Sequence, residues 1–312
     1  MKITLLAIFL SFAGTFMAQN IKIPDYLNFN ETLNDQITRL VEKYNIGGDY
    51  DVGEDGIEQI SFAVIDMTNG KNDFAGYSYD NFIYPASVYK MYAGAALLKK
   101  CYEGEYDLYR NYVASGHNIV DRTREIKSDP RSLIEDGDEL TIHYLLDLMI
   151  TRSDNTAANC VIDLANREYI NKMMADNGWE GSEVTRKFLS RKYEDPGFEK
   201  IRGTETCALH AADFMYKIAN DKLENPWVSN RMEIFLGAQI DKSKLASGLP
   251  KDAVMYHKTG WWSYWTNDVG FVKAGNLTYV IALFTPIPEK DALKIFKDIS
   301  GEVYNIIKER NK

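Results

Sequence analysis

Segments with the periodicity of β-strands stand near both ends of this chain, and this distribution constrains the fold most. Two β-rich runs, 58–67 and 71–77, flank the turn T-N-G-K and predict a hairpin. Three further runs follow near the C-terminus, at 254–262, 266–273 and 277–284, with short turns between them. Short connections favour antiparallel neighbours, so we expect one antiparallel sheet of five strands, built from both ends of the chain.

Amphipathic helices are predicted beside these strands, at 30–46 and 289–309. The middle of the chain, 84–237, is mostly helical in pattern and reads as an inserted all-α lobe. The predicted fold is therefore α/β of the α+β type, in which 20–83 and 238–312 form one α/β lobe. A cleft between the sheet edge and the inserted helices is the expected ligand site.

The first 19 residues read as a secretory signal peptide. One lysine precedes an apolar run that ends in small residues, and cleavage is expected near Ala18 or Gln19. The competing interpretation is a buried N-terminal helix. The run is short for a membrane span and no cysteine stands at the cut, so we expect a secreted or periplasmic protein without stable membrane insertion.

The composition argues against several classes of partner. The 312 residues carry a net charge of -9, whereas a nucleic-acid partner requires a basic face. The three cysteines allow at most one disulfide and suit a protein core better. No histidine stands in a metal-binding spacing, so we expect no metal and no cofactor. The histidines are His117, His143, His210 and His257, and the cysteines Cys101, Cys160 and Cys207.

A serine and a lysine three residues apart, Ser87 and Lys90, stand in Y-P-A-S-V-Y-K-M at the predicted start of an apolar helix. This spacing puts both side chains on one helix face, where a desolvated amine can take the hydroxyl proton. Unpaired N–H groups of the first turn suit an oxyanion. Alone the pattern is weak, because about one S-x-x-K is expected by chance and an exposed Ser and Lys are ordinary on a helix.

Two further motifs follow in order along the chain. S-D-N at 153–155 leads into a helix and, by itself, would be explained as an N-cap. H-K-T-G at 257–260 lies on a predicted strand, and alone would be an edge lysine before a turn glycine. S-x-x-K, S-D-N and K-T-G together, in this order and context, match the signature of serine β-lactamases and penicillin-binding proteins. The combination predicts an acyl-transfer site.

The chain resembles class A serine β-lactamases over nearly all of its mature length. The similarity extends through L-T-I-H-Y-L-L-D-L-M-I-T-R-S-D-N-T-A-A-N and includes V-T-R, R-G-T-E-T, S-G-L-P and T-N-D-V-G. The fold of that family, a β-lactamase/transpeptidase-like α/β lobe with an inserted all-α lobe, agrees with the organisation predicted above.

The resemblance implies a role for each motif residue. Ser87 would be the acylated nucleophile, and Lys90 would take or relay its proton. Ser153 would pass a proton to the departing ring nitrogen. Asn155 would hold Lys90 and the carbonyl of the substrate side chain.

The third motif would bind the remaining parts of the substrate. Lys258 and Thr259 would attract its carboxylate, and the backbone N–H groups of Ser87 and Trp261 would form the oxyanion hole. Trp261 and Trp262 stand where the family usually has small residues, which changes the rim of the cleft.

The resemblance fails on the segment after V-T-R. Class A enzymes carry E-x-x-L-N there, and its glutamate activates the water that releases the acyl group. This chain reads K-F-L-S-R-K-Y-E-D-P-G-F-E-K-I, and the register places the expected position near Ser190 or Arg191. Glu194 is the best-placed acid because a turn follows it, with Asp195 and Glu199 as alternatives. Solvated, salt-bridged side chains are the competing interpretation.

Three functions share these motifs. The leading hypothesis is an exported serine β-lactamase that opens β-lactam rings through an acyl-enzyme on Ser87. The alternatives are a peptidase acting on D-Ala-D-Ala peptides and a covalent penicillin-binding or sensor protein that does not hydrolyse its adduct. The missing glutamate motif supports both alternatives. Nothing in the sequence requires more than a monomer.

Overall fold

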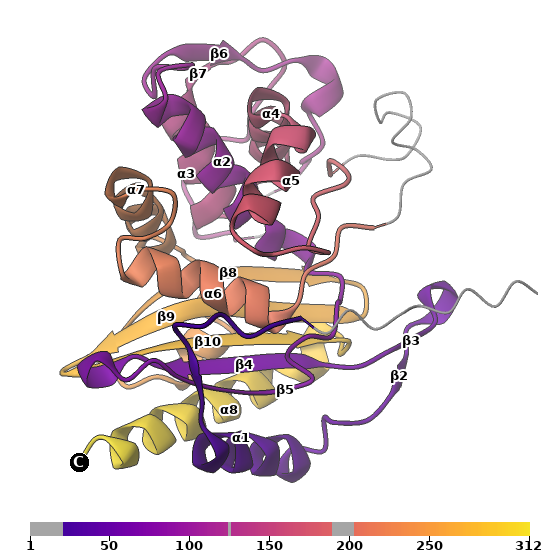
Figure 1. The fold of residues 1–312 in the computed structure, drawn as a ribbon. Helices are drawn as coiled ribbons and strands as arrows, with labels where there is room; N and C mark the ends of the chain where they lie inside the picture. The colour runs from indigo at the N-terminus through magenta and orange to yellow at the C-terminus, as the bar shows by residue number, and fades with distance from the viewer. Residues whose placement is uncertain (1–20, 124–125, 189–202) are drawn as a thin grey trace, which may run out of the picture.

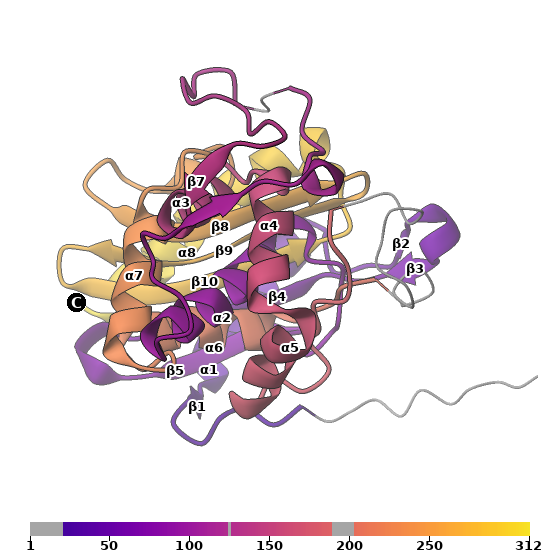
Figure 2. The ribbon, with the colours of Figure 1, turned by 90° about the horizontal axis from the view of Figure 1, so that it is seen from above.

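A six-stranded sheet forms the centre of the fold. The computed structural model describes residues 21–123, 126–188 and 203–312. The strand order is β1-β5-β4-β10-β9-β8, with β1 labelled in Figure 2 and the other five strands in Figure 1. The strands are β1 (Asn28–Phe29), β4 (Ser61–Asp66), β5 (Asp73–Tyr77), β8 (Val254–Trp262), β9 (Trp265–Ala274) and β10 (Leu277–Thr285).

The pairing of β4 with β10 joins the two ends of the chain. These strands are antiparallel, with Val64 opposite Ile281. The predicted α/β class and the origin of the sheet from both termini are therefore confirmed. The five predicted strands are antiparallel as expected, but the sheet has one strand more than predicted, because β1 pairs with β5 in parallel. This strand has two residues, too few to produce a periodic pattern in the sequence.

Both faces of the sheet are buried, as the alternation along β10 shows. Tyr279, Ile281 and Leu283 point to the layer of α1 (Glu31–Lys43) and α8 (Glu289–Arg310). Their neighbours Val280, Ala282 and Phe284 point to the other core, on which α6 (Ala208–Ala219) packs. Successive side chains of a strand face opposite sides, so each face contributes to its own core.

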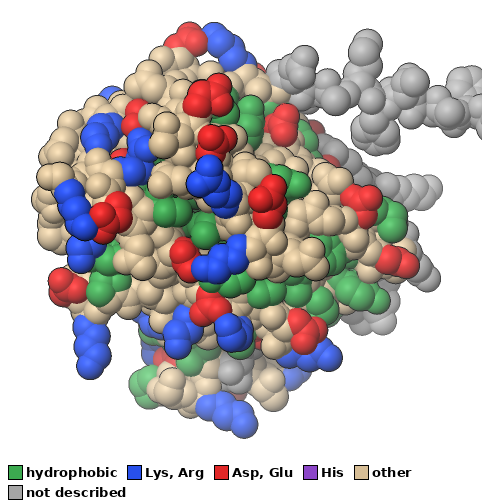
Figure 3. Space-filling model, turned by 90° about the horizontal axis from the view of Figure 1, so that it is seen from below, with side chains coloured by type: hydrophobic (Ala, Val, Ile, Leu, Met, Phe, Trp, Pro, Cys, Tyr) green, Lys and Arg blue, Asp and Glu red, His purple; other side chains and the backbone are tan. Residues whose placement is uncertain are grey.

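The helices α1 and α8 lie side by side under the sheet (Figures 1 and 2). Asn30 caps α1 by accepting a hydrogen bond from the Leu33 N–H at 3.0 Å. This helix ends at Lys43, earlier than predicted, because Asn45 adopts a left-handed conformation with φ of 51°. Lys43 pairs with Glu302 of α8. Figure 3 shows acidic and basic side chains interspersed on this lower face.

The remaining helices gather above the sheet around α2 (Figures 1 and 2). Helix α2 is buried along most of its length and packs on α3, α4, α5 and α7. The bounds of these helices are Lys90–Tyr102 for α2, Ile142–Thr151 for α3, Asn155–Ala165 for α4, Arg167–Asp176 for α5 and Pro226–Gly237 for α7. The division of the chain at 84 and 237 stays a prediction, and α6 packs on the sheet although it falls inside the predicted helical lobe.

Two short strand pairs lie outside the six-stranded sheet. The pair β2 (Tyr50–Asp51) and β3 (Ile57–Glu58) projects beside the sheet, and β6 (Asn111–Val113) pairs with β7 (Glu139–Thr141) over the helices.

All three cysteines are free thiols, with Cys160 and Cys207 buried. None of the helices in the described ranges has the length and apolar character needed to cross a bilayer. The predicted signal peptide lies outside the described residues.

A buried histidine on α6 ends a chain of hydroxyl groups. His210 Nδ1 lies 2.8 Å from Ser182 Oγ, which lies 2.8 Å from Thr206 Oγ1. The Nε2 atom of His210 has no hydrogen-bond partner among the described residues. Burial, with a smaller effect from the Lys217 charge, lowers the pKa of His210 to about 4.

This histidine makes the fold acid-sensitive. Because the folded pKa lies below the unfolded value of about 6.5, the unfolded chain binds the extra proton between these values, and stability falls as pH drops from about 6.5 through 4. We expect wild type to lose up to about 3 kcal/mol more than His210→Gln between pH 7 and 4.5 in urea unfolding. The exposed His117→Gln is the matched control. Equal losses in wild type and His210→Gln would contradict this assignment.

Candidate active site

Ser87 lies on a tight turn that leads into α2. Residues Ala86–Tyr89 form a 3-10 turn, and the α-helix begins only at Lys90, one turn later than the sequence suggested. Ala86 has a φ of 46°, in the left-handed region that a residue with a Cβ seldom occupies. This strained backbone presents the Ser87 side chain to two cavities that share it as a lining residue.

The amine of Lys90 is fully buried and points at the S-D-N segment. Its Nζ donates to the backbone oxygen of Ser153, to Ser153 Oγ at 3.2 Å and to Asn155 Oδ1 at 2.8 Å. All three acceptors belong to the S-D-N segment. They fix the amine between α2 and the start of α4.

Ser153 Oγ also accepts a hydrogen bond from the opposite side of the cleft. Lys258 Nζ on β8 lies 3.0 Å from this hydroxyl and 2.7 Å from the Thr259 carbonyl oxygen. Lys258 is fully buried, and burial, followed by the nearby Lys90 charge, lowers its pKa well below the ordinary value. One hydroxyl therefore stands between two lysine amines.

Strand β8 approaches the Ser87 turn as closely as a backbone can. A Cβ added to Gly260 would lie 2.6 Å from the Pro85 carbonyl oxygen and 2.8 Å from the Ser87 nitrogen. Only glycine fits this contact, which explains the glycine of K-T-G in physical terms. The contact places Trp261, the next residue, beside the Ser87 turn.

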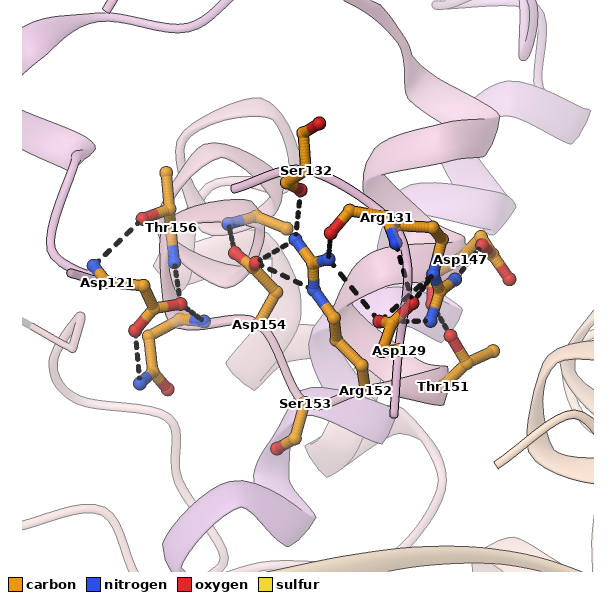
Figure 4. Close-up of polar contacts among 12 residues, drawn as sticks. Asp121, Asp129, Arg131, Ser132, Asp147, Thr151, Arg152, Ser153, Asp154 and Thr156 are labelled. Atoms are coloured by element: carbon orange, nitrogen blue, oxygen red, sulfur yellow. Dashed lines mark hydrogen bonds and ion pairs between the residues drawn. The ribbon is translucent and has the colours of Figure 1, made fainter. Parts of the chain in front are cut away.

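A buried charge network holds the S-D-N loop from behind (Figure 4). The Arg152 guanidinium donates to Asp154 Oδ2 at 2.8 Å and to Asp129 Oδ2 at 3.4 Å. It also donates to the carbonyl oxygens of Arg131 and Ser132. Figure 4 shows the Ser153 side chain pointing away from this network. Ser153 itself has a φ of 63°, so its flanking residues hold a strained conformation.

Asp121 orients the amide of Asn155. Its Oδ1 accepts from Asn155 Nδ2 at 2.9 Å, and its Oδ2 accepts from the Asn155 backbone N–H at 2.7 Å. The amide oxygen of Asn155 must then face Lys90, where it accepts. Sequence reasoning missed both Asp121 and Arg152. Arg152 directly precedes S-D-N, so its position in the sequence could have suggested a role. Asp121 lies in a loop far from S-D-N in the sequence, and no motif around it indicates a role.

Phe188 covers one side of the Lys90 amine. Its ring centre lies 4.2 Å from Lys90 Nζ, and the ring stacks on Tyr89 with a centroid distance of 4.8 Å. Its backbone N–H donates to Asn159 Oδ1 at 2.7 Å, which ties this segment to α4. The predicted base Glu194, with its alternatives Asp195 and Glu199, lies outside the described residues.

The structure thus brings seven of the eight predicted site residues to one cleft. Two cavities meet at Ser87, one of about 210 Å³ that reaches Ser153 and Thr259 and one of about 460 Å³ that reaches Asn155. The residues brought together are Ser87, Lys90, Ser153, Asn155, Lys258, Thr259 and Trp261. A serine hydroxyl, two buried amines and a second hydroxyl equip this cleft for acyl transfer.

Comparison with known proteins identifies the family. Residues 21–307 match the model of the Beta-lactamase enzyme family, which covers most of the chain. The chain therefore belongs to the β-lactamase enzyme family, and its class is that of the β-lactamase-like serine hydrolases.

Individual relatives agree with this assignment. Beta-lactamase AST-1 of Nocardia asteroides is 29% identical over 215 residues, which are 66% of this chain and 65% of that protein. A β-lactamase from Sphaerobacter thermophilus shares the fold with a TM-score of 0.73 at 20% identity, over 88% of this chain and 97% of the other. A mutant of PBP-A, solved as an acyl-enzyme complex with penicillin-G, has a TM-score of 0.71 at 21% identity, over 89% and 97%.

The Arg152 network generates a prediction about stability. In Arg152→Met, the carboxylates of Asp129 and Asp154 stay buried but lose a shared cation, so we expect the free energy of unfolding to fall by about 3 kcal/mol or more. Lys172→Met removes an exposed partner of Asp176 and should cost less than about 1 kcal/mol. Urea denaturation measures both. Equal effects would show that the Arg152 network contributes no more than a surface pair.

Proposed function

We propose that this protein is an exported serine hydrolase that opens β-lactam rings through an acyl-enzyme on Ser87. The observation that carries the proposal is the Ser153 hydroxyl, which is hydrogen-bonded to both Lys90 and Lys258 beside Ser87. Export rests on the sequence of the first 19 residues.

In the proposed acylation, Ser87 Oγ attacks the ring carbonyl carbon while its proton passes to the Lys90 amine in its neutral form. An ester bond forms and the ring C–N bond breaks. The departing nitrogen takes a proton from the Ser153 hydroxyl, and an adjoining ammonium, that of Lys90 or Lys258, returns one to Ser153. The short distances from Ser153 Oγ to both amines support this relay.

Other groups would bind the parts of the substrate that do not react. The N–H groups of Ser87 and Trp261 would stabilise the oxyanion, and the close approach of Gly260 to the Ser87 turn supports this pairing. Thr259 and Lys258 would hold the substrate carboxylate at the smaller cavity. Asn155 Nδ2, oriented by Asp121, would donate to the carbonyl of the acyl side chain.

A second candidate function is favoured by Phe188. Its ring lies against the Lys90 amine. A hydrolytic water beside Lys90 would have to occupy the same space as this ring. This packing supports a long-lived acyl-enzyme, as in a D-Ala-D-Ala peptidase or a covalent penicillin-binding protein. A mutant of PBP-A, which shares the fold of this chain, has been solved as an acyl-enzyme complex with penicillin-G. In the first function, Glu194 would supply the carboxylate that activates the deacylating water.

One experiment separates these functions. Purified protein is mixed with a chromogenic cephalosporin, and turnover and intact mass are followed together. We expect continuous turnover with a transient adduct in wild type, neither in Ser87→Ala, and both in the exposed control Ser128→Ala. A stoichiometric burst with a stable adduct would favour the second candidate. No adduct and no turnover would reject both.

The deacylating base is tested by trapping. If wild type turns over, Glu194→Gln should accumulate the adduct, with turnover reduced by about 100-fold or more. Unchanged turnover would exclude Glu194 and direct the same test to Asp195 and Glu199.

A further inference from the structure

The larger cavity at Ser87 is walled by aromatic rings. Its volume is about 460 Å³, and both Ser87 and Asn155 border it. The rings belong to Tyr84, Tyr89, Phe188, Trp261 and Trp262. A cavity that combines a nucleophile with several aromatic side chains is suited to an apolar group attached to the reacting carbonyl.

One wall is preorganised. Tyr89 and Phe188 stack at an interplanar angle of 8°, and the Tyr89 hydroxyl donates to the Arg186 carbonyl oxygen at 3.2 Å. Tyr84 packs edge-on against Trp265 of β9, with ring centres 5.3 Å apart. Rings held by such contacts lose little freedom when a ligand binds, which favours affinity.

The opposite wall is left open to solvent. Trp261 is 41% exposed and Trp262 is 63% exposed, where β8 turns into β9. Ser263 follows with a φ of 49°, so a tight turn holds this pair at the rim. Neighbouring exposed indoles carry apolar area that a ligand ring can cover, and such patches mark binding sites.

The smaller cavity at Ser87 has a different chemistry. Arg152, Asp241 and Glu289 line it, together with Ser153 and Thr259. Lys244 Nζ, buried behind it, donates to Asp241 at 2.8 Å and to Glu289 at 2.7 Å. An apolar substituent placed there would remove water from these ionised side chains, which is unfavourable even though they are paired. The larger cavity is also bordered by Arg186 and Lys187, but five aromatic residues line it, whereas Trp261 is the one aromatic residue among the described lining of the smaller cavity. The larger cavity is therefore the better site for an apolar part of a substrate.

We infer that the aromatic cavity selects substrates whose acyl side chain ends in an aryl ring. This inference rests on the proposed acylation of Ser87. Once the acyl group is on Ser87, Asn155 would hold the side-chain amide at the cavity's edge, and the ring beyond that amide lies between Phe188 and Trp262. Trp262 acts as a specificity-determining residue, not a catalytic one.

The test uses two penicillins that differ only in the phenyl ring, one with a phenylacetyl and one with an acetyl side chain. The second-order rate of Ser87 acylation is measured for each by intact mass. We expect the phenylacetyl compound to react about 10- to 100-fold faster. Trp262→Ala should reduce this ratio about 10-fold while leaving the acetyl compound unaffected, and Trp262→Phe should keep most of the ratio.

Tyr264→Ala is the matched control. Tyr264 is 40% exposed at the same end of the hairpin and does not line either cavity as the described residues define them. It should leave the ratio unchanged. Equal rates for the two penicillins, or equal slowing of both in Trp262→Ala, would overturn the aryl preference and leave the proposed function intact. If neither penicillin acylates wild type, the proposed function fails and this inference falls with it.

Discussion

The hydroxyl of Ser153 lies between two buried lysine amines, and the candidate site depends on that arrangement. Lys90 reaches it from helix α2 and Lys258 reaches it from strand β8, so one oxygen atom joins the helical part of the fold to the sheet. Burial, followed by the effect of the nearby Lys90, lowers the pKa of Lys258. A lysine with a lowered pKa releases its proton more readily, which is what a proton relay to a leaving nitrogen requires.

Three structural devices hold this arrangement in place. The Arg152 network fixes the strained Ser153 from behind, and Asp121 sets the orientation of the Asn155 amide. Gly260 lets β8 touch the turn that carries Ser87. None of these three residues takes part in the proposed reaction. Yet a displacement of the reacting groups by about 1 Å can reduce the rate about 100-fold. The strain at Ser153 is thus maintained by buried charges around it.

Most of the helices and strands could be predicted because their apolar residues recur with a regular period along the sequence. The strands at 254–262 and 277–284 and the C-terminal helix were predicted nearly to the residue, since their apolar positions repeat over many residues. The short parallel strand β1 has too few residues to show a period. The three motifs located the cleft, but the partners of Asn155 and Lys90 come from separate loops. Contacts of this kind, such as those of Asp121 and Phe188, are created by folding and leave no pattern along the chain.

Locating the covalent adduct shows whether Ser87 is the acylated residue. Wild-type protein is acylated with a fluorescent penicillin, quenched in acid, digested with trypsin and analysed by tandem mass spectrometry. We expect the label on the peptide ending at Lys90, with the mass increment on Ser87. An adduct on Ser153 or on any other residue would contradict it.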